Sequence, residues 1–170
     1  SGFMLSIKMD NKKKSKTELM LEGLSKHNGM HVDVGHFSES GEHYSGLSYV
    51  DLMRLHHNGS PSHNIPPRPV LDILFENNLR ISKHPKVKAA LKRLVKGKVT
   101  ETSYKRFLQT VGRILAEEEV EIFGSRQLAP NTPQVAASKG GNNPLIDTGS
   151  LVDEVSYKDS ITKQRRKWHT

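Results

Sequence analysis

Histidine is the residue type whose number and spacing in this chain most suggest chemistry. Nine histidines are present, and His56, His57 and His63 fall within eight residues and close to Asp51. Imidazole and carboxylate groups are common ligands of zinc. His56 and His57 are adjacent, however, so on a helix their side chains would point about 100° apart. The helical His-Glu-x-x-His pattern is also absent, and we therefore expect no metal site.

The patterns of covalent catalysis and of phosphate binding are missing from the sequence. It has no Gly-x-Ser-x-Gly nucleophile elbow and no cysteine, which excludes disulfides and a cysteine nucleophile. The glycines of 139–143 lack a preceding strand and the Gly-Lys-Ser/Thr ending of a phosphate loop. The glutamates of 117–121 have no identifiable partner carboxylate for glycosidic chemistry. We expect a protein that is not an enzyme and that uses no cofactor.

Basic residues are concentrated at the two ends and in one internal stretch. The formal net charge is +8, and residues 1–16 and 158–170 each contribute +4. The residues between them are neutral overall, but Arg80 to Arg113 contains eleven basic residues and one acidic residue, Glu101. Such polarity favours head-to-tail contacts between copies of a chain. We expect a basic N-terminal arm at 1–16 and a basic C-terminal tail at 158–170, both flexible when no partner is bound.

Basic ends are also typical of proteins that bind nucleic acid. Trp168 lies beside Arg165, Arg166 and Lys167, where it would be able to stack on a base or to anchor the tail on a neighbouring subunit. We favour the anchor, because a single aromatic residue makes a poor stacking track. A basic accessory protein that binds nucleic acid without sequence specificity is the alternative to an assembly role.

The composition limits the size of the hydrophobic core. Hydrophobic residues make up 34% of the chain and charged residues 26%, which is a low apolar share for a globular protein. A chain with a thin core often gains stability by associating with copies of itself. We expect neither a membrane span nor a secretory signal, because no apolar run is long enough for the first and none begins the sequence.

Hydrophobic spacing and cap residues predict the shorter elements that position these groups. Short helices are predicted from about Glu18 to near Gly29, after the N-cap Ser48, and over 86–96, where His84-Pro85 begins the helix. Alternating residues predict a strand over 30–34 and a final strand over 151–157.

The clearest element is a long helix. Apolar residues recur at spacings of three and four over Tyr104–Ile122, and Thr100 or Thr102 begins the helix. Gly124 is expected to end it in the left-handed conformation. Helices with few, separated strands favour an α+β fold over a βαβ repeat. We predict a single α+β domain over 17–157, in which a small β-sheet packs with one long and several shorter helices.

Two segments of the sequence resemble a known protein family. The first is Tyr49–Gly59 followed by the crossing Ile65-Pro66-Pro67-Arg68-Pro69-Val70-Leu71. The second is Leu128–Thr132 followed by Pro144-Leu145-Ile146-Asp147-Thr148-Gly149-Ser150-Leu151. In this order around one long helix, over about residues 30–157, they are similar to segments of tailed-bacteriophage neck and tail-completion (head–tail joining) proteins of the HK97 gp10-like group.

The resemblance implies a non-enzymatic virion component. Such a protein would form a homo-oligomeric ring around the DNA channel at the head–tail junction, or would complete and terminate the tail. Its partners would be other phage neck, connector and tail proteins, with DNA in the channel as a further contact and with no membrane. It would be made in the bacterial host cytoplasm and located in the virion.

The residues that carry the resemblance are expected to define the fold and its assembly. They are Ile65, Pro66, Pro67, Arg68, Pro69, Leu145, Ile146, Asp147, Thr148, Gly149 and Leu151. The prolines would hold an extended crossing, and Arg68 would direct its guanidinium to a carboxylate. Gly149 would adopt a positive φ in a turn after Asp147.

Contacts between copies are expected to join surfaces of opposite charge, since a head-to-tail interface uses two different surfaces of each subunit. The basic candidates are Lys86, Lys88, Lys92, Arg93 and Lys96. The acidic candidates are Glu117, Glu118, Glu119 and Glu121. Trp168 and the Leu145–Ile146 turn are the candidate apolar anchors.

Overall fold

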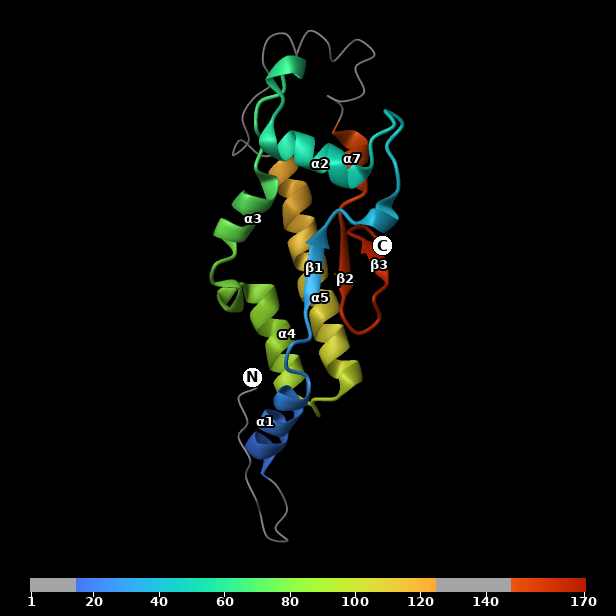
Figure 1. The fold of residues 1–170 in the computed structure, drawn as a ribbon. Coiled ribbons are helices and arrows are strands. Elements are labelled where there is room, and N and C mark those ends of the chain that lie inside the picture. Colours follow the sequence, from blue (N-terminus) through green and yellow to red (C-terminus); the bar gives the residue numbers. More distant parts are fainter. Residues whose placement is uncertain (1–14, 125–147) are drawn as a thin grey trace.

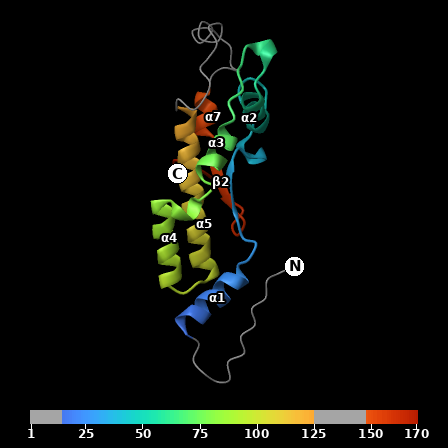
Figure 2. The same ribbon diagram turned by 90° about the vertical axis from the view of Figure 1, so that its left-hand side faces the viewer.

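The computed structural model describes residues 15–124 and 148–170 (Figure 1). The molecule is elongated, with helix α1 (Lys16–Lys26) at one end and helices α2 (Tyr49–Asn58) and α7 (Gly149–Asp153) at the other (Figures 1 and 2). Most of the predicted N-terminal arm and the segment 125–147 lie outside the described residues.

The long helix is confirmed as α5 (Glu101–Phe123), which runs along the body of the molecule (Figure 1). Thr100 is its N-cap: the Thr100 hydroxyl accepts a hydrogen bond from the Ser103 amide at 3.1 Å, and the Ser103 hydroxyl accepts one from the Thr100 amide at 2.8 Å. Gly124 follows the helix but has a φ of −94°, so the predicted left-handed cap was wrong.

A three-stranded antiparallel sheet packs against α5. Its strands are β1 (Val32–Gly35), β2 (Ser156–Asp159) and β3 (Arg165–Lys167), in the order β1-β2-β3. β1 confirms the strand predicted near 30–34. In the register of the sheet, Tyr157 of β2 lies between Val34 of β1 and Arg166 of β3.

The contact between α5 and the sheet is close because a glycine lies at its centre. A Cβ atom on Gly112 would lie 2.7 Å from Val32 Cγ2 and 2.9 Å from Tyr157 Cδ2. These distances are shorter than carbon atoms tolerate, so a larger residue would push the helix away from the sheet. Gly112 therefore sets the distance between the two layers.

The remaining helices confirm most of the local predictions. Ser48 caps α2, the apolar stretch after the proline crossing forms α3 (Val70–Asn77), and α4 (Pro85–Lys96) begins at the expected proline. α4 packs beside α5 (Figure 2). Short 3₁₀ turns lie at Ser38–Ser40, Pro61–His63 and Ile81–Lys83. The fold is α+β, as predicted.

The structure contradicts the prediction for the end of the chain. Leu151 and Val152 belong to helix α7 rather than to a strand, and the tail predicted at 158–170 continues β2 and forms β3. Asp159 organises the turn between these strands: its carboxylate accepts hydrogen bonds from the Thr162 amide at 2.7 Å and the Thr162 hydroxyl at 2.7 Å. The folded domain therefore does not end at residue 157.

The positive charge of the C-terminal segment is balanced by acidic residues that precede it. Arg165 Nη1 lies 3.2 Å from Glu154 Oε2, and Lys167 Nζ lies 2.9 Å from Glu154 Oε1 and 3.3 Å from Asp153 Oδ2. Because these partners come from the end of α7, the segment folds back on its own domain. No helix within the described ranges is both long and apolar enough to cross a membrane.

Candidate functional site

The proline crossing contains neither helix nor strand over Pro66–Pro69, and its backbone is fixed at both ends. Ser60 and Ile65 exchange two backbone hydrogen bonds, with N–O distances of 2.8 and 3.0 Å. The Arg68 amide donates to the His56 carbonyl at 2.8 Å, which ties the crossing to the last turn of α2. The crossing thus joins α2 to α3 with little freedom.

Glycine is required where α2 ends against this crossing. Gly59 has a φ of +75°, a conformation that disfavours other residues. A Cβ atom at this position would also lie 2.7 Å from the backbone nitrogen of Pro67. Gly59 therefore allows the end of α2 to pack against the proline crossing.

Arg68 is buried, with 8% of its surface exposed. Burial lowers the pKa of its guanidinium from the ordinary value, because a buried charge loses solvation. The expected contact between Arg68 and a carboxylate stays a prediction.

The described part of the second motif packs directly on the first. Leu151 of α7 is fully buried in one cluster with Leu52, Met53, Val70, Leu74 and Ile122. Thr148 precedes α7 as its N-cap residue, and Gly149 is the first helical residue, so the positive φ predicted for Gly149 was wrong. Leu145, Ile146 and Asp147 lie outside the described residues.

The acidic candidates on α5 differ in their surroundings. Glu118 lies 3.0 Å from His84 Nε2 and accepts a hydrogen bond from the Asn78 side chain at 2.7 Å. Glu119 is fully buried, whereas Glu121 is exposed. Glu119 therefore does not belong to an acidic surface, and its choice as an interface residue was wrong. A contact of Glu117, Glu118 and Glu121 with a second copy stays a prediction.

Glu119 is an unusual buried acid. Neither carboxylate oxygen has a hydrogen-bond partner within the described part of the chain. Burial raises the pKa of Glu119 to about 8, because the charged form loses its solvation. At neutral pH this side chain is therefore mostly protonated and is not a candidate for an ion pair between subunits.

The five basic candidates on α4 divide between two faces of the helix. Lys86 and Arg93 are seven residues apart and line a groove between α4 and α5. Lys88, Lys92 and Lys96 recur at a spacing of four on another face and do not line it. The structure thus separates the groove residues from basic residues that only face solvent.

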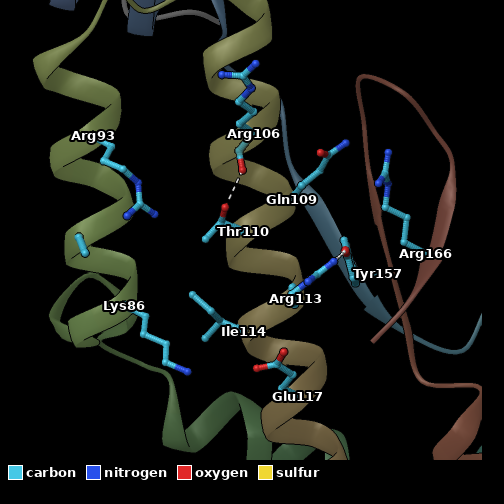
Figure 3. A pocket seen from close by; sticks show the side chains of 11 residues that line it. Lys86, Arg93, Arg106, Gln109, Thr110, Arg113, Ile114, Glu117, Tyr157 and Arg166 are labelled. Atoms are coloured by element: carbon cyan, nitrogen blue, oxygen red, sulfur yellow. Dashed lines mark hydrogen bonds between the residues drawn. The ribbon is translucent and has the colours of Figure 1, made fainter. Parts of the chain in front are cut away.

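The groove encloses about 640 Å³ between α4, α5 and the β2–β3 hairpin (Figure 3). Five of the side chains that line it are basic and one is acidic. The basic residues are Lys86, Arg93, Arg106, Arg113 and Arg166, and the acidic residue is Glu117. The remaining lining residues are Ala89, Gln109, Thr110, Ile114 and Tyr157.

Contacts within the fold hold one wall of the groove in place. Arg113 Nε donates to the Tyr157 hydroxyl at 3.4 Å, and Arg113 Nη2 donates to the Thr170 carbonyl oxygen. The hydrogen bond to Tyr157 raises the pKa of Arg113 above its ordinary value. Gln109 donates to Asp159 at 3.1 Å. These contacts connect α5 with β2 and the segment after β3 along one side of the groove.

Three basic residues of the groove were not among the candidates drawn from the sequence. Arg106 and Arg113 are seven residues apart on α5, which matches the spacing of Lys86 and Arg93 on α4. This spacing can be read from the sequence, but the packing of α4 beside α5 cannot. Arg166 joins them only because β3 pairs with β2, in a segment predicted to be a flexible tail.

Trp168 packs on its own domain. Its half-buried ring lies against the cluster of Ala116, Val155 and Tyr157, and its backbone amide donates to the Val155 carbonyl at 3.0 Å. The expected contact of Trp168 with a second subunit stays a prediction.

The clustered histidines do not converge. His57 Nε2 lies 3.5 Å from Asp72, and His63 Nδ1 lies 2.8 Å from the Ser60 hydroxyl. His56 is buried in the last turn of α2. Across residues 15–124 and 148–170, no three histidine or acidic side chains are arranged to hold a metal ion.

An exposed apolar row follows the proline crossing. Leu71, Phe75 and Leu79 are spaced by four residues along α3 and the turn after it, and their exposed fractions are 36%, 69% and 67%. Val70 and Leu74 of the same helix face the core. The outer side of α3 therefore exposes Leu71 and Phe75 next to the acidic Asp72 and Glu76.

The described residues thus present two surfaces without an obvious role in the fold, the apolar row and the basic groove. Comparisons of the chain with protein-family models, with curated proteins and with solved structures find no match.

Proposed function

We propose that this protein is a structural component of a tailed bacteriophage that assembles into a ring at the neck or completes the tail. The order of the two sequence motifs around one long helix supports this role. In the fold, the described parts of both motifs meet in one core, where Val70 packs with Leu52 and Leu151. A shared core explains why both segments would be needed in the same protein.

The observation that carries the assembly role is the exposed apolar row of Leu71, Phe75 and Leu79. Large apolar side chains that gather on a surface are typical of interaction sites. The rigid crossing and the buried side of α3 fix the position of this row. A row held in this way would be suited to packing against another subunit, because little conformational entropy would be lost on association.

Electron microscopy of the purified full chain tests this role. The wild-type chain is expected to form rings with a central opening. Replacing Phe75 and Leu79 together by glutamate should abolish the rings, because two charges would then face an apolar contact. The monomer should stay folded, because both side chains are largely exposed.

The matched control keeps the row apolar. The double variant Phe75→Leu with Leu79→Met should still form rings. Rings of the same size from the glutamate variant would show that this row is not the subunit contact, and a wild-type chain that never assembles would contradict the proposed role.

A basic accessory protein that binds nucleic acid is the second candidate function. The observation that favours it is the groove, where basic side chains outnumber acidic ones by five to one. A chain that binds nucleic acid as a monomer, and that forms no ring at any concentration, would favour this candidate over the first.

A further inference from the structure

We propose that the groove between α4, α5 and the β2–β3 hairpin binds the phosphodiester backbone of DNA without contacting the bases. The site would act through Lys86, Arg93, Arg106 and Arg166 (Figure 3). This inference rests on the groove and does not require the proposed ring.

The charge of the groove is not balanced within the fold. Some cations elsewhere have acidic partners: Arg54 Nη1 lies 2.9 Å from Asp51, and Lys158 Nζ lies 2.8 Å from Glu39. Within the described ranges, the side chains of Lys86, Arg93, Arg106 and Arg166 make no ion pair and no hydrogen bond. Four cations that line one groove without partners create a field that attracts an anion.

The spacing of the cations suits a chain of phosphates better than a single anion. Lys86 and Arg93 lie on one helix at a spacing of seven residues, and Arg106 and Arg113 lie on the next helix at the same spacing. Seven residues of helix rise by about 10 Å. One strand of a DNA duplex advances about 3.4 Å along the axis for each phosphate, so such a row spans roughly three phosphates.

The chemistry of the lining favours the backbone over the bases. The guanidinium group matches a phosphate because it presents several N–H donors in one plane. Base stacking requires an exposed ring, but Tyr157, which is the aromatic residue of the groove, is 2% exposed. Small-molecule sites are mostly apolar, whereas the aliphatic residues here are only Ala89 and Ile114. The groove therefore fits an anionic polymer held by charge.

The test measures binding of the full chain to a short labelled DNA duplex of mixed sequence by fluorescence anisotropy. The double variant Arg93→Glu with Arg106→Glu should bind at least about tenfold more weakly at low salt, because it replaces phosphate contacts with repulsion. The matched control is Lys88→Glu with Lys92→Glu. The control changes the net charge of the protein by the same amount but leaves the groove residues intact. Its affinity for DNA should therefore fall much less.

A milder pair separates specific contacts from the general effect of charge. Arg93→Gln with Arg106→Gln should reduce the slope of log affinity against log salt by about 2, since two phosphate contacts are lost. Circular dichroism should show that each variant is folded. Ring size, measured on the same variants, should stay unchanged, so that a failure of this inference is distinguishable from a failure of the proposed function.

Three outcomes would overturn the inference. An equal loss of DNA affinity in the groove variant and in the control variant would show that only the net charge of the protein matters. Competition by polyglutamate as effective as that by unlabelled DNA would assign the groove to an acidic protein surface. Binding that discriminates strongly between duplex sequences would show that the bases are contacted after all.

Discussion

Glu119 lies in the core of the fold without a hydrogen-bond partner in the described part of the chain. Burial raises its pKa from the ordinary value of a glutamate to about 8. The folded protein therefore keeps this proton over a range of pH in which the unfolded chain releases it. Folding becomes less favourable as the pH rises through this range, and the effect is complete above the pKa of the folded state.

The variant Glu119→Gln should remove this pH dependence. Near pH 4 it should have nearly the stability of the wild type, because both states of the wild type are then protonated. Near pH 8 it should be more stable, by an amount on the order of 3 kcal/mol. Urea denaturation of both proteins at several pH values measures the difference. Stability curves that stay parallel from pH 4 to pH 8 would contradict the burial of an unpaired acid.

The predictability of single residues depended on whether their role is local. Ser48 was recognised as an N-cap, and Thr100 was one of two candidates for the long helix, because a cap depends on neighbours in the sequence. The burial of Glu119 could not be recognised, since its position among other acids resembles a solvated helix end. Arg166 was missed for the same reason, because its place in the groove depends on strand pairing.

At the scale of elements, the packing of α5 on the sheet depends on Gly112. Replacing Gly112 by alanine should lower the melting temperature by several degrees, because the new Cβ atom would lie 2.7 Å from Val32 Cγ2. The helix propensity of alanine would offset this loss by only about 1 kcal/mol. Thermal unfolding followed by circular dichroism measures the change.

Gly97 provides the control for this substitution. It has a φ of −88°, and an added Cβ atom would meet only the Arg93 carbonyl oxygen, at 3.6 Å. Gly97→Ala should therefore leave the melting temperature nearly unchanged. A Gly112→Ala variant as stable as Gly97→Ala would show that the helix and the sheet are less closely packed than described.

The hairpin of β2 and β3 makes the end of the chain part of the domain. Trp168→Ala should destabilise the fold by about 2–3 kcal/mol, because it removes a large ring from the cluster of Ala116, Val155 and Tyr157. Trp168→Phe should restore part of the loss. Denaturant unfolding measures both variants, and an unchanged midpoint for Trp168→Ala would support the mobile tail predicted from the charge pattern.

Elements with local signatures were predictable, and elements that depend on distant contacts were not. The apolar spacing of α5 and the proline that begins α4 were sufficient to place those helices. β3 has the sequence Arg-Arg-Lys, which lacks the alternation of a strand. It forms because β2 pairs with it and because Asp153 and Glu154 neutralise the charges of Arg165 and Lys167, which no local pattern reveals.

At the scale of the whole molecule, the structure changes the expected mode of association. The sequence suggested that a basic stretch meets an acidic cluster across copies, but within the fold Glu118 is paired with His84 and Glu119 is buried. The exposed apolar row then becomes the proposed subunit contact, and the basic groove stays available for DNA. An apolar subunit contact is consistent with the small contribution of exposed ion pairs, which stabilise an association by only about 0–1 kcal/mol each.

Sedimentation velocity of the full chain tests the central claim of ring assembly most directly, because it measures the mass of the species in solution. The wild type and the groove variant Arg93→Glu with Arg106→Glu should sediment as the same oligomer over a range of protein concentrations. The row variant Phe75→Glu with Leu79→Glu should sediment as a folded monomer. A wild-type chain that stays monomeric at every concentration, or a row variant that sediments with the wild type, would contradict the account.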